Sequence, residues 1–325
     1  MLTPDITAGA ALDSSLNNLL VHVSVLPLQP FVAHDVGLEP LSDLLGARGE
    51  DKLAGRIDFA ETMARVHAAM ARGTPSLATL RDTQSGTLVI CGGGPSIGDL
   101  DEIKAIRALQ KKGAKVWAVN KTHDFLLTKG IVPWACCLLD PMPWVADYVR
   151  RPRKDVIYAV ASQCDARVFE ALKGFDARMW HAGVDYFGEG YPTQILQSTY
   201  ANRDWLVIPG PTTVGLRSIL VGYALGFRDF HLFGLDSSLR GDALHAYAKP
   251  KPPDAPEGVV TLRTKAGAQS FRTNAHMARQ ALDFEETVER IAGMVRERVM
   301  APISIAVHGD GLIPALAECY GWRVK

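Results

Sequence analysis

This sequence has no excess of charge of either sign and no long apolar run. Its 325 residues carry 35 lysines and arginines against 35 aspartates and glutamates, so the formal net charge is zero. A chain without excess positive charge has no overall attraction to nucleic acid or to an anionic membrane surface. No apolar run reaches the length of a membrane span. We therefore expect no membrane span and no large nucleic-acid interface.

Cysteine is scarce, and the few cysteines show no functional spacing. Their positions match neither a zinc-ligand pattern nor a disulfide framework. An odd cysteine count is typical of a reducing compartment, and the first ten residues lack the basic and apolar regions of an export signal. We expect a cytoplasmic protein. The five cysteines are Cys91, Cys136, Cys137, Cys164 and Cys319.

Several catalytic motifs are also missing. The chain contains no G-x-S-x-G nucleophile elbow and no lysine of a Walker phosphate-binding loop. It has no cluster of zinc ligands and no interleaving of aromatic and basic residues of the kind that binds single-stranded nucleic acid. These absences argue against serine hydrolases, P-loop enzymes, zinc enzymes and nucleic-acid platforms.

What is present is a regular alternation of short β-rich runs and helical patterns from residue 86 onward. Strands that are apolar on both faces and separated by helices indicate a parallel sheet covered on both sides. We predict an α/β fold, a Rossmann-like doubly wound, mostly parallel sheet. The predicted strands are 87–91, 115–119, 134–140, 156–160, 205–209, 229–236 and 303–307, and the predicted helices include 97–112, 212–225 and 274–299.

The chain divides into an N-terminal extension, residues 1–80, and a nucleotide-binding domain, residues 81–325. The extension is weakly patterned until a helix predicted over residues 58–73. Within the second part, residues 247–258 contain four prolines and little apolar content, so we expect a mobile loop. Because this loop follows a core strand, we predict that residues 240–272 form a lid that covers a site. The alternative is a plain surface insertion.

The stretch "LVICGGGPSIG", residues 88–98, ends a strand in three glycines. Glycines allow close backbone approach, and the amides at a helix start form a site for an anion. Ser96 or Asp99 can cap the following helix. The G-x-G-x-x-G fingerprint is not cleanly present, and a tight turn is the structural alternative. We predict that the loop formed by Gly92, Gly93, Gly94, Pro95 and Ser96 is a site for a phosphate or another anion.

Polar residues follow other predicted strands, and the carboxyl ends of parallel strands share one edge of the sheet. Asn120 is placed to read a base or a sugar, or else it or Thr122 caps a helix. Asp140 is placed to hold Mg²⁺ or accept from a ribose hydroxyl, or else it caps a turn. Thr212 and Thr213 open a second helix at the same edge, and a further strand ends at Gly234, Leu235 and Asp236.

The stretches "GGGPS", "VPWACCLLDP" and "GLRSILVGYALGFRDFHLFGLD" with "ALHAY" resemble the MptE-like family. The same pattern is similar to bacterial motility-associated glycosyltransferases and to bacterial sialyltransferases with a G-N-G-P-S loop. The resemblance covers roughly residues 55–310. It implies a Rossmann-like transferase that binds a nucleotide or a nucleotide sugar.

The resemblance also implies roles for single residues. Asn120, Thr212 and Thr213 would contact the nucleotide, Asp236 would close its pocket, and Tyr247 would match loosely a tyrosine that grips the leaving phosphate. His276, which opens the helix after the lid, would be the general base, because imidazole has a near-neutral pKa. His245, at the near edge of the lid, is the competitor.

Two chemistries and one binding role remain open. The first is a glycosyltransferase that uses a nucleotide-sugar donor and a hydroxyl acceptor, and it requires no cofactor. The second is a diphosphokinase that uses ATP and Mg²⁺ on a 6-hydroxymethylpterin-type substrate, with Asp140 and Asp236 as metal ligands. The third is a non-catalytic nucleotide-binding module. We place the glycosyltransferase first.

Overall fold

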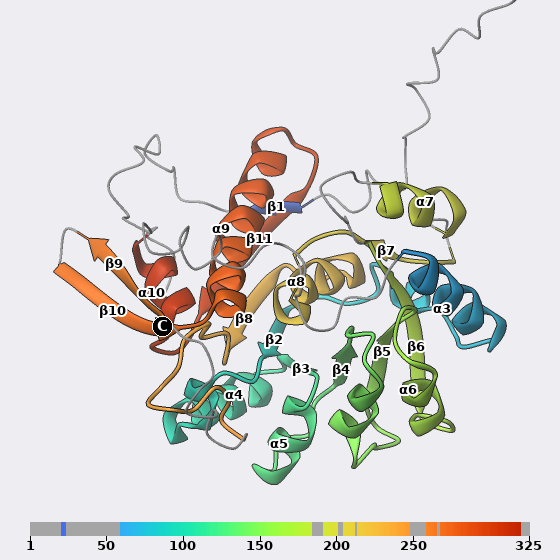
Figure 1. The fold of residues 1–325 in the computed structure, drawn as a ribbon, viewed down its shortest axis with the longest axis horizontal. Helices are drawn as coiled ribbons and strands as arrows, with labels where there is room; N and C mark the ends of the chain where they lie inside the picture. The colour runs from blue at the N-terminus through green and yellow to red at the C-terminus, as the bar shows by residue number, and fades with distance from the viewer. Residues whose placement is uncertain are drawn as a thin grey trace, which may run out of the picture.

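The computed structural model confirms the predicted parallel α/β fold (Figure 1). Nine strands form one sheet in the order β1-β11-β8-β2-β3-β4-β5-β6-β7, and every neighbouring pair is parallel. Two further strands, β9 and β10, pair antiparallel as a separate hairpin. The described residues are 21–23, 59–183, 191–200, 204–211, 213–247, 258–264 and 267–319.

The strands at the centre of the sheet are short and almost wholly buried, as expected for a sheet covered on both faces. Their bounds are β1 Val21–Val23, β2 Thr87–Cys91, β3 Lys115–Val119, β4 Ala135–Leu138, β5 Ile157–Ala161, β6 Asp176–Ala182, β7 Val207–Ile208, β8 Asp229–Phe233, β9 Gly258–Thr264, β10 Gly267–Thr273 and β11 Ala301–Val307.

The helices connect these strands in the order expected for a doubly wound fold. The α-helices are α3 Phe59–Ala71, α4 Leu100–Lys111, α5 Thr122–Thr128, α6 Ala166–Ala171, α7 Tyr191–Tyr200, α8 Val214–Leu225, α9 Ala275–Arg296 and α10 Leu312–Cys319, and the 3-10 helices are η2 Leu77–Leu80, η3 Pro95–Gly98 and η4 Pro143–Val149. Among them, none is long and apolar enough to cross a membrane.

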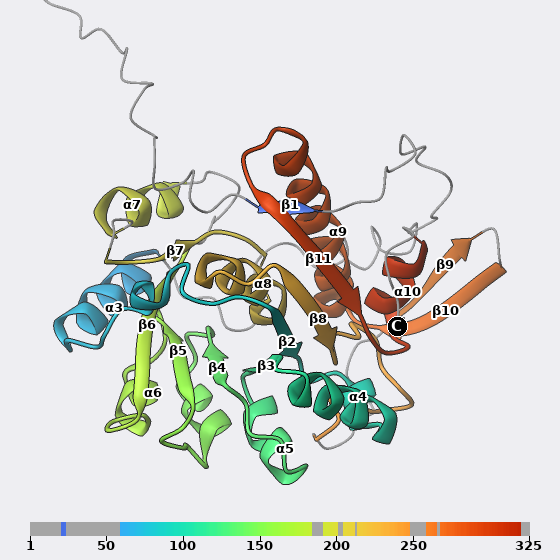
Figure 2. The same cartoon turned by 180° about the vertical axis from the view of Figure 1, so that it is seen from behind.

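The path of the chain creates one switch point in the sheet. From β2 the chain moves outward strand by strand to β7, then returns through α8 to β8, on the other side of β2. Right-handed crossovers in opposite directions place α4 and α5 on one face and α8 and α9 on the other (Figures 1 and 2). A crevice therefore opens at the carboxyl ends of β2 and β8, the usual ligand site of this fold class.

Helix α8 is buried along almost its whole length and forms part of the core. It packs closely on β2, since a Cβ added to Gly222 would lie 2.5 Å from Leu88 Cδ2. Trp117 of β3 is fully buried, and its indole N–H donates to the Ser218 hydroxyl of α8 at 2.9 Å. The sheet and α8 thus share one core beneath the switch point.

The structure differs from the sequence prediction in several elements. Strand β6 was not predicted, because the first three of its seven residues are only partly buried and include two charged side chains. Part of the predicted lid forms the β9–β10 hairpin, while residues 248–257 lie outside the described part. The helix predicted from residue 97 starts as η3 and becomes α4 only at Leu100.

The first 80 residues also contribute to the sheet. Strand β1 pairs in parallel with β11, so the sheet gains an edge strand from the predicted extension. The predicted helix over residues 58–73 is confirmed as α3, and Gly73 follows it with a φ of +68°. Val66 of α3 packs in a small second cluster with residues of α7 and β7.

Gly226 gives a direct test of the packing of α8. This residue ends α8 with a φ of +114°, and a Cβ there would overlap the Gln84 carbonyl oxygen. We expect Gly226→Ala to lower the free energy of unfolding by about 2–4 kcal/mol, because strain and overlap add. Gly113, with a φ of +96° and open space around it, is the matched control.

Gly113→Ala carries only the backbone strain, so its expected cost is about 1–2 kcal/mol. Urea unfolding followed by circular dichroism measures both values. Equal losses in the two variants would contradict the packing described at Gly226.

Candidate functional site

A pocket lies at the switch point, at the carboxyl ends of β2, β3 and β8 and at the start of α8. Its walls also include residues of the segment after β8 and of α9. Nine of the residues predicted from sequence line it, although they are scattered over more than 150 positions. They are Gly92, Gly93, Gly94, Asn120, Thr213, Gly234, Asp236, His245 and Tyr247.

The other predicted residues do not line this pocket. Ser96 and Pro95 are buried behind its wall, and Asp140 lies behind Asn120. His276 reaches the wall only through Gln280, a lining residue of α9. Thr212 lies outside the described residues, so its predicted contact stays a prediction.

The amides of the glycine loop are mostly used inside the protein, contrary to the expectation that they are bare. Gly92 N–H donates to the Phe233 carbonyl at 2.8 Å, and Gly94 N–H donates to the Gly234 carbonyl at 2.7 Å. Both acceptors belong to the end of β8. Gly93 is half-buried and lines the pocket, and the described structure shows no acceptor for its amide. An anion therefore has one free loop amide available, not a row of them.

The three glycines are required by contacts within the protein itself. A Cβ on Gly92 would overlap the backbone of the loop after β8. A Cβ on Gly93 would overlap the Tyr247 hydroxyl, and one on Gly94 would overlap the Asp236 carboxylate. Glycine is needed here because side chains and backbone of the crevice touch the loop directly.

Asp236 holds the glycine loop from the opposite side. Its Oδ2 accepts from the Ser96 N–H at 2.8 Å, while its Oδ1 is buried without a hydrogen-bond partner in the described structure. Burial raises the pKa of Asp236, and hydrogen bonds from Ser96 oppose this shift. Gly309 and Gly311 of the loop after β11 pack against it, so Asp236 is only 3% exposed.

Next to Asp236 lies an acidic group that sequence reasoning missed. Arg240 donates to Asp99 at 2.7 Å and to Asp310 at 2.5 Å, so it joins three loops. Asp99 sits at the cap position of α4 but makes no side-chain capping bond, and its carboxylate binds Arg240 instead. Burial, followed by the charges of Asp236, Asp99 and Asp310, raises the pKa of Glu102 to about 7.

Asn120 has an unusual backbone conformation, with a φ of +51°. Its side-chain amide donates to Asp140 Oδ2 at 2.9 Å, and its Oδ1 is buried without a partner in the described residues. It therefore does not cap α5, and Thr122 does not either: the Thr122 hydroxyl lies 3.2 Å from the Tyr247 hydroxyl. Burial raises the pKa of Asp140, and the Asn120 bond and the charge of His276 lower it.

His245 and Tyr247 form one wall of the pocket. Their rings stack at 5.7 Å with an angle of 15°, and His245 Nδ1 lies 3.2 Å from the Gly93 carbonyl oxygen. A carbonyl only accepts, so Nδ1 carries the proton and Nε2 keeps its lone pair. Loss of part of its hydration, followed by the nearby charges of Lys121 and His276, lowers the pKa of His245, and the bond to the Gly93 carbonyl opposes this shift.

His276 is arranged differently. Its Nε2 accepts from the side-chain amide of Gln280 at 2.9 Å, and Gln280 Oε1 accepts from the Ser237 hydroxyl at 3.1 Å. Exclusion of water lowers the pKa of His276, and the charges of Asp140 and Asp283 oppose that shift. The lone pair of His276 Nε2 is thus already engaged, whereas no described residue donates to Nε2 of His245.

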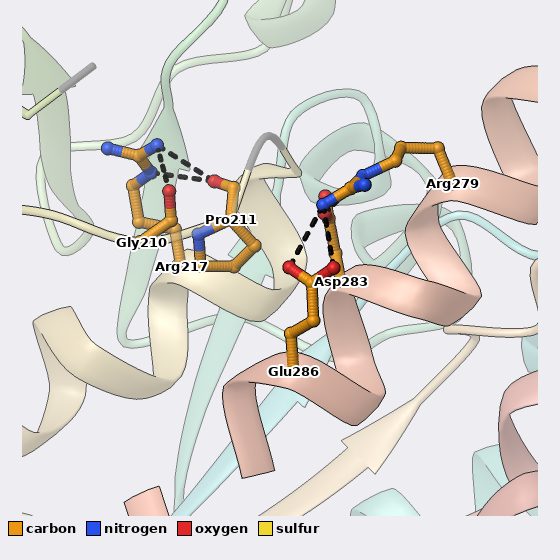
Figure 3. Close-up of polar contacts among 6 residues, drawn as sticks. All are labelled: Gly210, Pro211, Arg217, Arg279, Asp283 and Glu286. Carbon is orange, nitrogen blue, oxygen red and sulfur yellow. Dashed lines mark hydrogen bonds and ion pairs between the residues drawn. The ribbon is translucent and has the colours of Figure 1, made fainter. Parts of the chain in front are cut away.

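The start of α8 is fixed by its own hydrogen bonds. The Thr213 hydroxyl caps the helix by accepting from Leu216 N–H at 3.2 Å. Arg217, which is 3% exposed, donates to the Gly210 carbonyl at 2.7 Å and to the Pro211 carbonyl at 2.8 Å (Figure 3). A buried arginine therefore fixes the turn after β7. This turn leads into Thr213, which lines the pocket.

Helix α9, which carries His276 and Gln280, has an ion-pair group of its own. Arg279 donates to Asp283 at 2.8 Å and to Glu286 at 2.9 Å (Figure 3). Asp283 is 3% exposed, so the Arg279–Asp283 pair lies on the side of α9 that faces the core. All three residues belong to α9, so these ion pairs stabilise the helix itself.

A Mg²⁺ ion prefers several oxygen ligands. Within the part of the chain that the structure describes, no three His, Cys, Asp or Glu side chains could hold a metal ion together. Asp236 lines the pocket, whereas Asp140 does not. The residues present fit a shared metal between Asp140 and Asp236 poorly.

Comparisons with known proteins agree with this architecture. The family model described as 6-hydroxymethylpterin diphosphokinase MptE-like matches residues 62–242. No curated protein sequence matches the chain. Among solved structures, a MAf glycosyltransferase from Magnetospirillum magneticum AMB-1 is similar, with 22% identity, a TM-score of 0.54 and 78% of this chain covered.

The chain spans 36% of the length of that glycosyltransferase, and the likeness shows the fold. A weaker likeness, with a TM-score of 0.37 and 15% identity, links it to the sialyltransferase CstII from Campylobacter jejuni, solved in complex with cytidine-5'-monophosphate. That match covers 73% of this chain and 84% of CstII.

Glu102 gives the acidic group a measurable pH dependence. Its folded pKa, about 7, lies above the unfolded value of about 4.3, so the folded state binds the proton more tightly. Stability should therefore fall as pH rises from about 4.3 to 7. Glu102→Gln keeps the shape of the side chain without its charge. We therefore expect the free energy of unfolding of the variant, relative to that of wild type, to be about 1–2 kcal/mol higher at pH 8 than at pH 5, after allowance for solvent screening.

Urea unfolding of both proteins at pH 5 and pH 8 makes the comparison, with the exposed Glu297→Gln as control. The same pH dependence in wild type and Glu102→Gln would show that Glu102 does not titrate in this range.

Proposed function

This chain belongs to the 6-hydroxymethylpterin diphosphokinase MptE-like family, and on that premise we propose that it is a nucleotide-dependent transferase. The pocket at the switch point supports the proposal, because doubly wound folds bind nucleotides at this edge of the sheet. The reaction we propose is transfer of a sugar from a nucleotide-sugar donor to a hydroxyl acceptor.

One observation carries the proposed transfer to a hydroxyl acceptor: the tautomer and position of His245. This residue lines the pocket, its Nδ1–H is fixed to the Gly93 carbonyl, and its Nε2 is available as a base. A lowered pKa keeps the ring neutral at physiological pH, the form that accepts a proton.

The step is a displacement at the sugar. The acceptor hydroxyl gives its proton to His245 Nε2 while its oxygen bonds to the anomeric carbon. The bond from that carbon to the phosphate oxygen breaks, and the nucleotide leaves with the electron pair. Among the two predicted histidines, we assign the base to His245, because His276 Nε2 is occupied by Gln280.

A diphosphokinase is the second candidate, and the description of the family model favours it. In that reaction ATP and Mg²⁺ would supply a diphosphate to a hydroxymethyl group, with Asp140 and Asp236 as the predicted metal ligands. Asp236 lines the pocket and Asp140 does not, which weighs against a metal ion held by both. A non-catalytic nucleotide-binding module remains the third alternative.

A nucleotide screen separates these functions. Ligands that bind the folded state raise its melting temperature by mass action, so nucleotides and nucleotide sugars are tested with and without Mg²⁺. We expect a rise of several degrees with one class of nucleotide or nucleotide sugar, without a need for Mg²⁺. A rise confined to ATP with Mg²⁺, together with ATP turnover, would instead establish the diphosphokinase.

The assignment of the base is tested by two matched variants. We expect His245→Gln to lower kcat by about 10²–10⁴-fold while donor affinity changes little, because only proton transfer is lost. His276→Gln should lower kcat by less than about tenfold.

The pH profile of the wild type gives a second test. Because the pKa of His245 is lowered, kcat of the wild type should stay level above about pH 6.5 and should fall below that pH, where the base becomes protonated.

Kinetics with the donor and acceptor found in the screen, measured from pH 5 to 9, give these values. A large loss in His276→Gln with little change in His245→Gln would reverse the assignment.

A further inference from the structure

Lys121 is the one lysine or arginine among the described residues that line the pocket. It follows β3 directly, and its ammonium group lies 5.7 Å from the centre of the Tyr247 ring. The described structure shows no carboxylate paired with it, and its side chain is exposed. A cation that has no carboxylate partner among the described residues, at the wall of a pocket, is available to an anionic ligand.

Two further donors lie beside this cation. The Tyr247 hydroxyl is next to the Cα of Gly93, since a Cβ there would overlap it. Gly93 also carries the one loop amide that finds no acceptor in the described structure. The hydroxyl of Thr122, 3.2 Å from the Tyr247 hydroxyl, holds that ring in place. The residues that carry the ammonium group, the Tyr247 hydroxyl and the loop amide come from three segments, and all of them line the pocket.

The pocket also has one carboxylate among its described lining residues, that of Asp236. This carboxylate accepts from the Ser96 amide and so occupies the position that an anion would otherwise take there. If ionised, it would also repel a phosphate at that position. A phosphate is therefore better placed beside Lys121 than at the Ser96 amide.

We infer that Lys121, with the Gly93 amide and the Tyr247 hydroxyl, binds the phosphate of the donor nucleotide. This inference rests on the proposed nucleotide-dependent function and adds where the phosphate lies. The sequence predicted that the amides of the glycine loop bind the phosphate. In this inference the main phosphate ligand is instead the charged side chain of Lys121, which follows the neighbouring strand β3. Lysine is a common phosphate ligand and acts as a point charge.

The test compares a nucleotide with its own nucleoside, because only the phosphate differs between them. Calorimetry measures the affinity of wild type, Lys121→Met and Lys121→Arg for CMP, UMP, AMP and GMP and for the four matching nucleosides. Lys173→Met, an exposed lysine that does not line the pocket, is the control. Circular dichroism confirms that each variant is folded.

For the nucleotide that wild type binds best, we expect Lys121→Met to lose about 10–100-fold in affinity, as a lost charge-assisted hydrogen bond predicts. Its affinity for the nucleoside should stay within about twofold, Lys121→Arg should recover part of the loss, and the control should match wild type. Binding of the nucleotide by Lys121→Met should also depend less on salt.

Equal losses for nucleotide and nucleoside, or no loss for either, would overturn the role of Lys121 while leaving nucleotide binding intact. Binding of neither nucleotides nor nucleosides by the wild type would overturn the proposed function and this inference together.

Discussion

The contact between the ends of β2 and β8 is the feature on which the site depends. Two backbone hydrogen bonds and the bond from the Ser96 amide to Asp236 join the loops at the switch point. They form only because Gly92 and Gly94 have no side chain that would separate the two backbones. The same closeness brings Tyr247 against the first loop and leaves a pocket between β3, α8 and α9. A single packing constraint thus sets both the sheet and the position of the pocket.

This constraint changes the meaning of the triple glycine. In many nucleotide-binding folds the amides of such a loop face a phosphate. Here they are turned toward β8 and toward Asp236, which stands where an anion would bind. In the function proposed above, the positive charge comes instead from Lys121, one strand away, and the base is His245, whose Nδ1 lies beside the Gly93 carbonyl. Lys121 and Asp236 are the oppositely charged residues among the described lining of the pocket.

Much of the fold could be predicted from sequence, because seven strands of the parallel sheet are apolar runs between helices with clear ends. Strand β6 could not, because its first residues are polar and its pattern does not alternate. The hairpin β9–β10 was hidden next to a proline-rich stretch that suggested a loop. The site was predicted as a set of strand-end residues, and most of them do meet. Contacts between loops, such as those of Arg240 and Glu102, leave no local signal.

In the proposed function, a donor phosphate lies beside Lys121 and the Gly93 amide. A crystal of the protein soaked with the nucleoside monophosphate that it binds best would reveal where the phosphate sits. We expect density for the phosphate within hydrogen-bond distance of Lys121 Nζ and Gly93 N, with Asp236 still bound to the Ser96 amide. Phosphate density at the Ser96 amide with Asp236 displaced, or in a different cleft, would contradict it.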